Sequence, residues 1–248
     1  MLPYVAIGGS MWLQIFCVLF LLCNGLCYSS DLNGKDTSLP KKPKIVIVCT
    51  SALIVDNYEM RQQEYAQALS RLREYGYEPY VFEARKLRSP SFLEEYSNHV
   101  FYSNVHNYQV RNKGINEATS MLAGINHYQF DDETMIIKTT GRYWLNSRLF
   151  LDIVENHPEM DAIVRFSGAY PPDSYVITGC FAMRCKYFKE MLEQLDLVKM
   201  EQQWISIECE VADYICKMEE QGCSVMRVDK IDMTANVGSH NPPIIAEW

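Results

Sequence analysis

Residues that could bind an anion cluster in the middle of the sequence, directly after a short apolar run. The run at residues 135–137 is typical of a fully buried strand. Two cations, two hydroxyls and a glycine follow it: Lys138, Thr139, Thr140, Gly141 and Arg142. Open α/β sheets bind ligands at the carboxyl ends of their strands, so we expect an anion site here, with Gly141 letting backbone approach the ligand. The alternative is that Lys138 and Arg142 form structural ion pairs only.

Two carboxylates near the C-terminal end are candidates for acid–base chemistry. Helical spacing predicts a helix over residues 204–218 with Trp204 in its apolar stripe, which places Glu208 near the middle of that stripe. A carboxylate there is costly unless it has a partner or a task. In the alternative, the helix begins at Ser206, and the helix dipole favours Glu208 in the first turn. If functional, Glu208 would be the base on a hydroxyl group or its hydrogen-bonding anchor, and Glu210 is the second choice.

Strands and amphipathic helices alternate along the chain and would position these residues. An apolar run at 44–51, a helical stripe at 65–75 and a strand at 78–83 predict a βαβ unit. We expect further strands at 135–138, 161–166, 175–184 and 224–229, and helices at 115–125, 148–156, 187–197 and 204–218. Segment 85–107 is expected to form a short helix and loops, and the tail from 233 to 248 a loop. The predicted class is α/β, with a mostly parallel central sheet flanked by helices.

The N-terminal segment is set apart by its composition. Residues 1–30 contain no charged side chain, and residues 11–23 are almost wholly apolar. A signal peptide usually carries a basic region, whereas an anchor needs roughly 17–25 apolar residues, which residues 11–28 just reach. We expect a membrane anchor in the secretory pathway, with a cleaved signal peptide as the alternative. Residues 31–43 are expected to be a stem, and residues 44–248 a single domain.

Composition argues against several classes of function. The net charge is −8 with no basic stripe, which argues against nucleic acid as a partner. No CxxC pair or zinc-ligand spacing occurs, so a metal finger is not expected. The cysteines permit disulfides, but Cys49 in a strand-like run is equally consistent with a buried thiol. The absence of a G-x-S-x-G elbow and of a G-x-G after the first strand disfavours α/β hydrolases and methyltransferases.

The order of these segments resembles that of GT-A-type glycosyltransferases, compact single-domain nucleotide-sugar enzymes that are often anchored by an N-terminal membrane segment. The resemblance rests on KIVIVCTS, NKGINEATSMLAGI, MIIKTTGRYWL, VITGCFAMRCKYFKEML and ISIECEVADYI, which span most of residues 44–213. It implies a Rossmann-like GT-A domain that transfers a sugar from a nucleotide-sugar donor to the hydroxyl of a glycan-type acceptor. In a eukaryote the expected location is the Golgi or ER lumen, and the same anchor would also suit a bacterial membrane.

The resemblance also assigns parts of the site. It implies that the opening strand, the end of the second strand and the loop before residue 115 hold the nucleotide, which names Thr50, Ser51, Glu83, Asn112, Lys113 and Gly114. The strand before Thr139 would deliver the diphosphate-binding residues. The VITGCF segment and the acidic helix with Glu208 and Glu210 would face the acceptor.

The chain departs from this family at one important position. Many of these enzymes carry an Asp-x-Asp at the end of the central strand, which holds a metal ion on the diphosphate. This chain has Lys-Thr-Thr-Gly-Arg at 138–142, so Mn²⁺ or Mg²⁺ is not supported and no metal ligands are expected. Lys and Arg can also offset the charge of a departing diphosphate, so we predict a clamp of Lys138 and Arg142, joined by Lys113. The alternative is a non-catalytic member of the fold that binds carbohydrate or nucleotide.

Overall fold

The computed structural model describes residues 43–53, 58–84, 91–167, 175–237 and 244–247. The expected anchor at 1–30 lies outside the described residues, as does the expected stem apart from residue 43. Among the helices within these ranges, none is long and apolar enough to span a bilayer.

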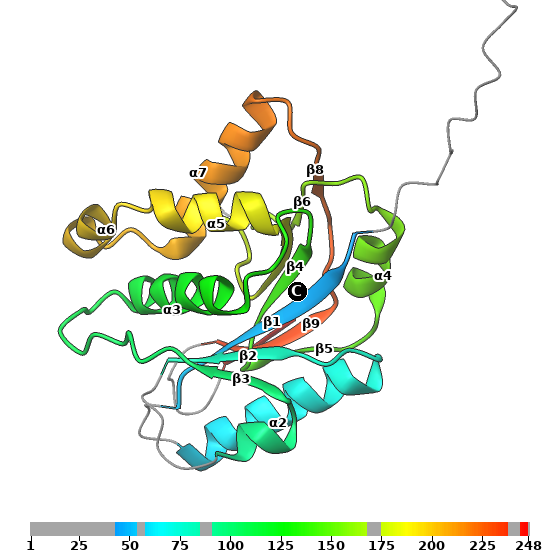
Figure 1. The fold of residues 1–248 in the computed structure, drawn as a ribbon, viewed down its shortest axis with the longest axis vertical. Helices are drawn as coiled ribbons and strands as arrows, with labels where there is room; N and C mark the ends of the chain where they lie inside the picture. Colours follow the sequence, from blue (N-terminus) through cyan, green and yellow to red (C-terminus); the bar gives the residue numbers. More distant parts are fainter. Residues whose placement is uncertain (1–42, 54–57, 85–90, 168–174, 238–243, 248) are drawn as a thin grey trace, which may run out of the picture. The chain divides into compact units, whose positions relative to one another are not determined.

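A seven-stranded sheet forms the centre of the domain, in the order β3-β2-β1-β4-β7-β6-β8 (Figure 1). Neighbouring strands are parallel except where β7 runs against β4 and β6. The strands are β3 (His99–Tyr102), β2 (Tyr80–Glu83), β1 (Ile45–Ser51), β4 (Met135–Thr140), β7 (Cys180–Arg184), β6 (Ala162–Val164) and β8 (Val225–Arg227). The predicted α/β class with a mostly parallel central sheet is therefore confirmed.

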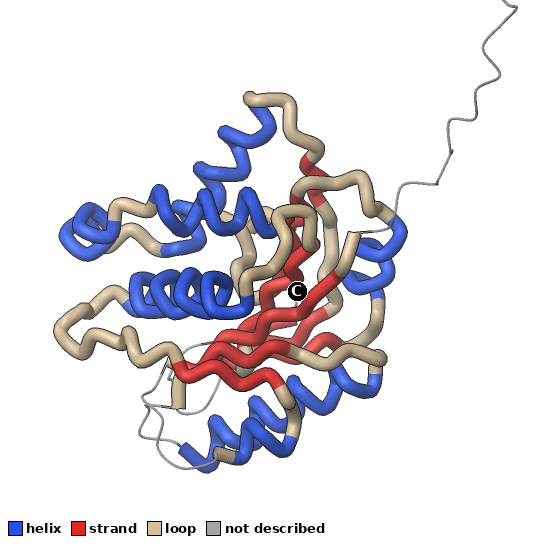
Figure 2. Tube along the Cα trace, in the orientation of Figure 1, coloured by secondary structure: helices blue, strands red, loops and turns tan. Residues whose placement is uncertain are grey.

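Helices cover both faces of this sheet (Figures 1 and 2). One face packs against α3 (Lys113–Tyr128), α5 (Cys185–Gln194) and α7 (Ile207–Glu220). The other packs against α2 (Tyr58–Glu74) and α4 (Leu149–Asn156). The short elements η1 (Phe92–Glu95) and α6 (Leu197–Gln203) complete the helical layers. Burial on both faces explains why β1 and β4 are continuous apolar runs.

Two predictions about strands were wrong. The tail predicted as a loop contains β9 (Met233–Val237) and β10 (Ile244–Glu247), and the segment 85–107 contains β3. Strands β9 and β10 form a three-stranded antiparallel sheet with β5 (Tyr143–Leu145). Because β5 directly follows the polar segment at the end of β4, its pairing with β9 places the C-terminal part of the chain next to that segment.

Register brings the polar ends of the central strands together. Thr50 of β1 lies opposite Thr140 of β4, and Ser51 lies opposite Glu83 of β2. Successive side chains of a strand point to opposite faces of the sheet. Thr50 and Lys138 accordingly point towards α3, whereas Ser51 and Glu83 point towards the α2 side.

Gly124 lets α3 lie directly on the sheet, and this contact is testable. A Cβ at this position would come within 2.4 Å of the Phe82 ring. Replacing glycine by alanine usually stabilises a helix by about 1 kcal/mol, but the overlap outweighs that gain. We expect Gly124→Ala to lower the free energy of unfolding by about 1–3 kcal/mol, measured by chemical denaturation. In a Phe82→Ala background the same change should be neutral or stabilising. A Gly124→Ala variant more stable than wild type would contradict the contact.

Candidate active site

The ammonium group of Lys138 is the centre of a buried polar network at the carboxyl end of the sheet. Lys138 is only 1% exposed. Its Nζ lies 2.7 Å from Glu117 Oε1, 2.9 Å from Thr140 Oγ1 and 2.6 Å from the carbonyl oxygen of Thr178. An ammonium group has three N–H donors, so all of them have partners inside the protein. This geometry supports the structural ion-pair alternative for Lys138 and gives no support to its role in a diphosphate clamp.

Glu117 is the ionic partner that sequence reasoning missed. Its Oε1 also accepts a hydrogen bond from Thr50 Oγ1 at 2.9 Å. Burial by itself would raise the pKa of Glu117, but the charge and hydrogen bond of Lys138 outweigh it and hold that pKa below its usual range, with help from Thr50 and Arg142. Glu117 is therefore ionised at neutral pH. In the sequence, Glu117 looks like any solvent-facing charge on an amphipathic helix.

Glu208 joins the same network through Thr178. Thr178 Oγ1 donates a hydrogen bond to Glu208 Oε1 at 3.0 Å. Ser206 is the N-cap of α7, so the interpretation that places Glu208 in the first helical turn is confirmed. Trp204, predicted in the apolar stripe of this helix, instead ends α6 and is 61% exposed. Glu210 occupies the same first turn and is half-buried.

Tyr175 adds a hydroxyl group beside Glu208, and no motif in the sequence singled it out. Burial, followed by the charge of Glu208, raises the pKa of Tyr175 to about 12. The phenol is therefore protonated at neutral pH and can donate a hydrogen bond. Tyr175 is 36% exposed, so it lies at the margin of the network rather than in its interior.

Three other predicted site residues, Ser51, Glu83 and Thr139, form buried hydrogen bonds on the α2 side of the sheet. Glu83 is fully buried, and its carboxylate accepts hydrogen bonds from the Ser51 hydroxyl and from the backbone N–H of Leu53 at 3.0 Å. Thr139 points to the same side and hydrogen-bonds Cys49, a buried free thiol whose pKa is raised to about 12 mainly by burial. A nucleotide-binding role for Ser51, Glu83 and Thr139 stays a prediction, and these contacts give each of them a structural role.

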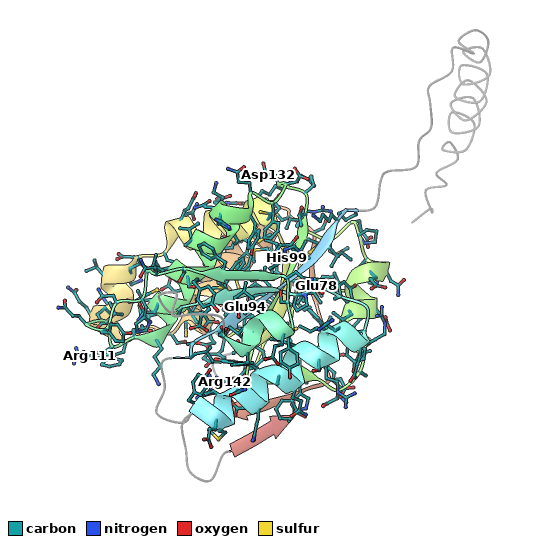
Figure 3. The ribbon with its side chains drawn as sticks, turned by 60° about the horizontal axis from the view of Figure 1, so that its bottom comes forward. Glu78, Glu94, His99, Arg111, Asp132 and Arg142 are labelled. Atoms are coloured by element: carbon teal, nitrogen blue, oxygen red, sulfur yellow. The ribbon has the colours of Figure 1, made fainter. Side chains whose placement is uncertain are left out.

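Gly141 and Arg142 lie where the chain leaves β4. A Cβ at Gly141 would come within 2.4 Å of the Tyr65 ring, so the space expected for a ligand next to this glycine is filled by a side chain of α2. Arg142 lies beside α2 (Figure 3), with its guanidinium carbon 5.5 Å from the centre of the Tyr143 ring. Its charge lowers the pKa of Glu117. Arg142 is half-buried, and it is the cation of the predicted clamp that lies next to the network without being enclosed in it.

The loop before α3 is held by α6. Asn112 is the N-cap of α3, and its Oδ1 accepts a hydrogen bond from the N–H of Gly114 at 3.1 Å. Its Nδ2 donates to the carbonyl oxygens of Met200 at 3.0 Å and Ile205 at 2.8 Å. Lys113, the first residue of α3, is exposed. The side-chain amide of Asn112 therefore joins α3 to the end of α6. The contact of this loop with a nucleotide stays a prediction.

The end of β4 does not offer the carboxylate ligands that a divalent metal ion prefers. The end of β4 carries Lys, Thr and Arg side chains instead of carboxylates. Within the described ranges, no three or more His, Cys, Asp or Glu side chains gather into a metal-binding group. The residues at the end of β4 therefore do not fit a divalent ion.

Comparison with solved structures decides the fold. The sequence matches no protein-family model and no curated protein. A protein from Bacillus anthracis, named as a glucose-1-phosphate thymidylyltransferase and solved with sucrose, is similar with a TM-score of 0.50 and 11% identity, over 77% of this chain and 89% of that chain. The chain has a GT-A-like fold.

Two further structures show weaker similarity to this GT-A-like domain. One is named as a nucleotide-diphospho-sugar transferase from Desulfovibrio desulfuricans G20 (TM-score 0.48, 8% identity, 75% of this chain and 80% of that chain). The other is a glycosyltransferase involved in glycosylation of the major capsid of PBCV-1 (TM-score 0.47, 10% identity, 75% and 82%). At such identities a comparison concerns the fold alone, and it is the similarity at a TM-score of 0.50 that confirms the GT-A-like architecture expected from the sequence.

The ion pair between Glu117 and Lys138 predicts a pH-dependent contribution to stability. Glu117→Gln leaves a buried ammonium without its anionic partner. We expect the free energy of unfolding at pH 7 to fall by about 1–3 kcal/mol, less than for a fully buried pair because the Glu117 side chain is 27% exposed. The folded-state pKa of Glu117 is depressed, so this stabilisation is present above the unfolded pKa and is lost as pH falls through the folded one.

Denaturation curves for wild type and Glu117→Gln should therefore approach each other as pH drops below about 4.3, the pKa of a free Glu side chain. The exposed Glu220, at the end of α7, supplies the matched control Glu220→Gln, for which little change is expected at either pH. A difference between wild type and Glu117→Gln that grew on acidification would show that the pair is not stabilising.

Proposed function

We propose that this protein is a glycosyltransferase that moves a sugar from a nucleotide-sugar donor to a hydroxyl acceptor. The observation that carries the proposal is the hydrogen bond that joins Glu208 to Thr178 and thereby to the polar network at the end of β4. Glu208 thereby places a carboxylate at the edge where α/β sheets bind their ligands, in a domain with a GT-A-like fold. GT-A-like folds serve several chemistries, so the site rather than the fold carries the argument.

On the acceptor side, Glu208 acts as the general base. Its carboxylate takes the proton of the acceptor hydroxyl while the acceptor oxygen bonds to the anomeric carbon of the donor sugar. The bond from that carbon to the diphosphate oxygen breaks, and its electron pair leaves with the nucleoside diphosphate. A base of this kind contributes roughly 10²- to 10⁴-fold in rate. Tyr175, protonated at neutral pH, supplies a hydrogen-bond donor beside the carboxylate.

On the donor side, Arg142 offsets the charge that develops on the leaving diphosphate. A guanidinium group can bind two phosphate oxygens at once, and Arg142 lies at the margin of the network, whereas Lys138 is enclosed in it. The exposed Lys113 at the start of α3 is the second cation, aided by the positive end of the helix dipole. The proposed clamp therefore consists of Arg142 and Lys113, and Lys138 belongs to the buried network beside it.

Nucleotide binding tests the donor side. Nucleoside diphosphates that bind the folded state should raise the melting temperature by mass action. We expect Arg142→Ala to weaken the best-binding nucleotide by about 10-fold, with or without Mn²⁺, because a charge-assisted hydrogen bond is lost. Arg71→Ala, which removes an exposed ion pair with Glu74 on α2, is the control and should bind as wild type does. Equal affinity of Arg142→Ala and wild type under both conditions would remove Arg142 from the clamp.

Turnover tests the acceptor side. Glu208→Gln keeps the size of the side chain and removes the base, so we expect kcat to fall by about 100-fold or more on a nucleotide-sugar donor that the wild type uses. Asp213→Asn, an exposed acid on the same helix, should retain kcat. If Glu210→Gln abolishes transfer and Glu208→Gln does not, the base is Glu210 instead.

A second candidate function is a non-catalytic protein that binds nucleotide or carbohydrate. It is favoured by the complete internal pairing of Lys138, which removes one of the cations expected to assist a leaving diphosphate. Nucleotide binding without release of nucleoside diphosphate, across a panel of UDP-, GDP- and CMP-sugars with simple glycosides as acceptors, would support this alternative.

A further inference from the structure

We propose that Thr178 and Lys138 are positioning residues that hold the Glu208 carboxylate in the orientation needed for transfer. The proposal rests on the role of Glu208 as base given above. It assigns to Lys138 a task other than ligand binding, and it assigns Thr178 a role in the reaction although the residue does not touch the reacting atoms.

Two hydrogen bonds tie Glu208 to a single short segment of chain. Thr178 Oγ1 donates to the carboxylate at 3.0 Å, and the N–H of Val176 donates to the backbone carbonyl oxygen of Glu208 at 3.2 Å. Fixing one carboxylate oxygen as well as the backbone restricts the side-chain torsions between them. The second carboxylate oxygen then has a defined position, because the carboxylate group is planar and rigid.

The segment that holds Glu208 is itself held by the centre of the sheet. Lys138 Nζ donates to the carbonyl oxygen of Thr178 at 2.6 Å, and the N–H of Thr140 donates to that of Gly179 at 3.0 Å. A Cβ at Gly179 would lie 2.4 Å from the Tyr143 ring, so β5 closes the segment on its other side. Glu208 is therefore connected to β4 through Thr178, and the Tyr143 ring against Gly179 restricts the movement of this segment.

Stability alone is a weak explanation for a buried lysine at this position. Replacing a buried ion pair by apolar side chains of similar size is often neutral or stabilising. Orientation of a base is a stronger one, since a general base must lie within about 2.6–3.2 Å of its proton donor. A displacement of about 1 Å can lower a rate by roughly 100-fold.

Thr178→Val is the decisive variant because it removes one hydroxyl and nearly preserves the shape of the side chain. We expect kcat to fall by about 10- to 100-fold while the KM for the donor stays within about 3-fold, since orientation and not donor binding is lost. Thr178→Ser restores the hydroxyl and should recover most of kcat. Thr119→Val is the matched control: it removes a half-buried hydroxyl whose hydrogen bond, to the backbone carbonyl oxygen of Ile115, stays within α3, and should keep kcat within about 3-fold.

A kcat for Thr178→Val within about 3-fold of wild type, or no recovery in Thr178→Ser, would overturn the proposal. A double-mutant cycle of Thr178→Val and Glu208→Leu, in which leucine removes both carboxylate oxygens, tests the link by chemical denaturation without any activity. We expect the two changes in the unfolding constant to be non-multiplicative by about 3-fold or more, and strict multiplicativity would overturn the link. If the wild type transfers no sugar and the cycle still shows coupling, the function proposed above has failed and the link itself stands.

Discussion

A buried ammonium group determines how the elements around the site meet. A charge in an apolar interior is costly unless it is paired and hydrogen-bonded, and Lys138 satisfies this demand with Glu117, Thr140 and Thr178. These partners come from α3, from β4 itself and from the segment before β7. Any change in the relative position of these elements would leave the ammonium group short of a partner. The network therefore fixes one arrangement, and Glu208 of α7 is added to it through Thr178.

Because side chains alternate along the strands, the two faces of the sheet carry different sets of polar groups. On the α2 side, Glu83 holds the chain after β1, and the ring of Tyr65 covers Gly141. On the opposite side the helices α3 and α7 begin next to each other, since a Cβ at Gly114 would lie 3.1 Å from that of Ile207. Both helices point the positive ends of their dipoles at this region, which favours Glu208 and Glu210 in the first turn of α7. Charge and hydrogen-bonding groups are thus concentrated on the α3 and α7 side.

Local patterns in the sequence were sufficient for the elements that form the core of the sheet. The apolar runs of β1 and β4 and the stripe of α3 depend on periodicity within one segment. In contrast, β9 pairs with β5 from a distant part of the chain, and no local pattern reports such a partner. The partner of Lys138 was hidden for the same reason: whether Glu117 faces solvent or the sheet depends on the rotation of α3 after packing. The start of α7 at its Ser206 cap settled the two interpretations of Glu208.

The segment after β4 places its two cations in different surroundings, and this separation suggests what each can do. Lys138 is enclosed, and it could bind an external anion only by giving up an internal partner, which would leave a buried polar group unsatisfied. Arg142, beyond the turn at Gly141, is half-buried at the edge of the network, with its guanidinium group next to the Tyr143 ring. An enclosed cation suits a fixed scaffold, whereas a cation at the margin suits a ligand that must arrive and depart. Under the function proposed above, the same short segment supports Glu208 through Lys138 and binds the diphosphate through Arg142.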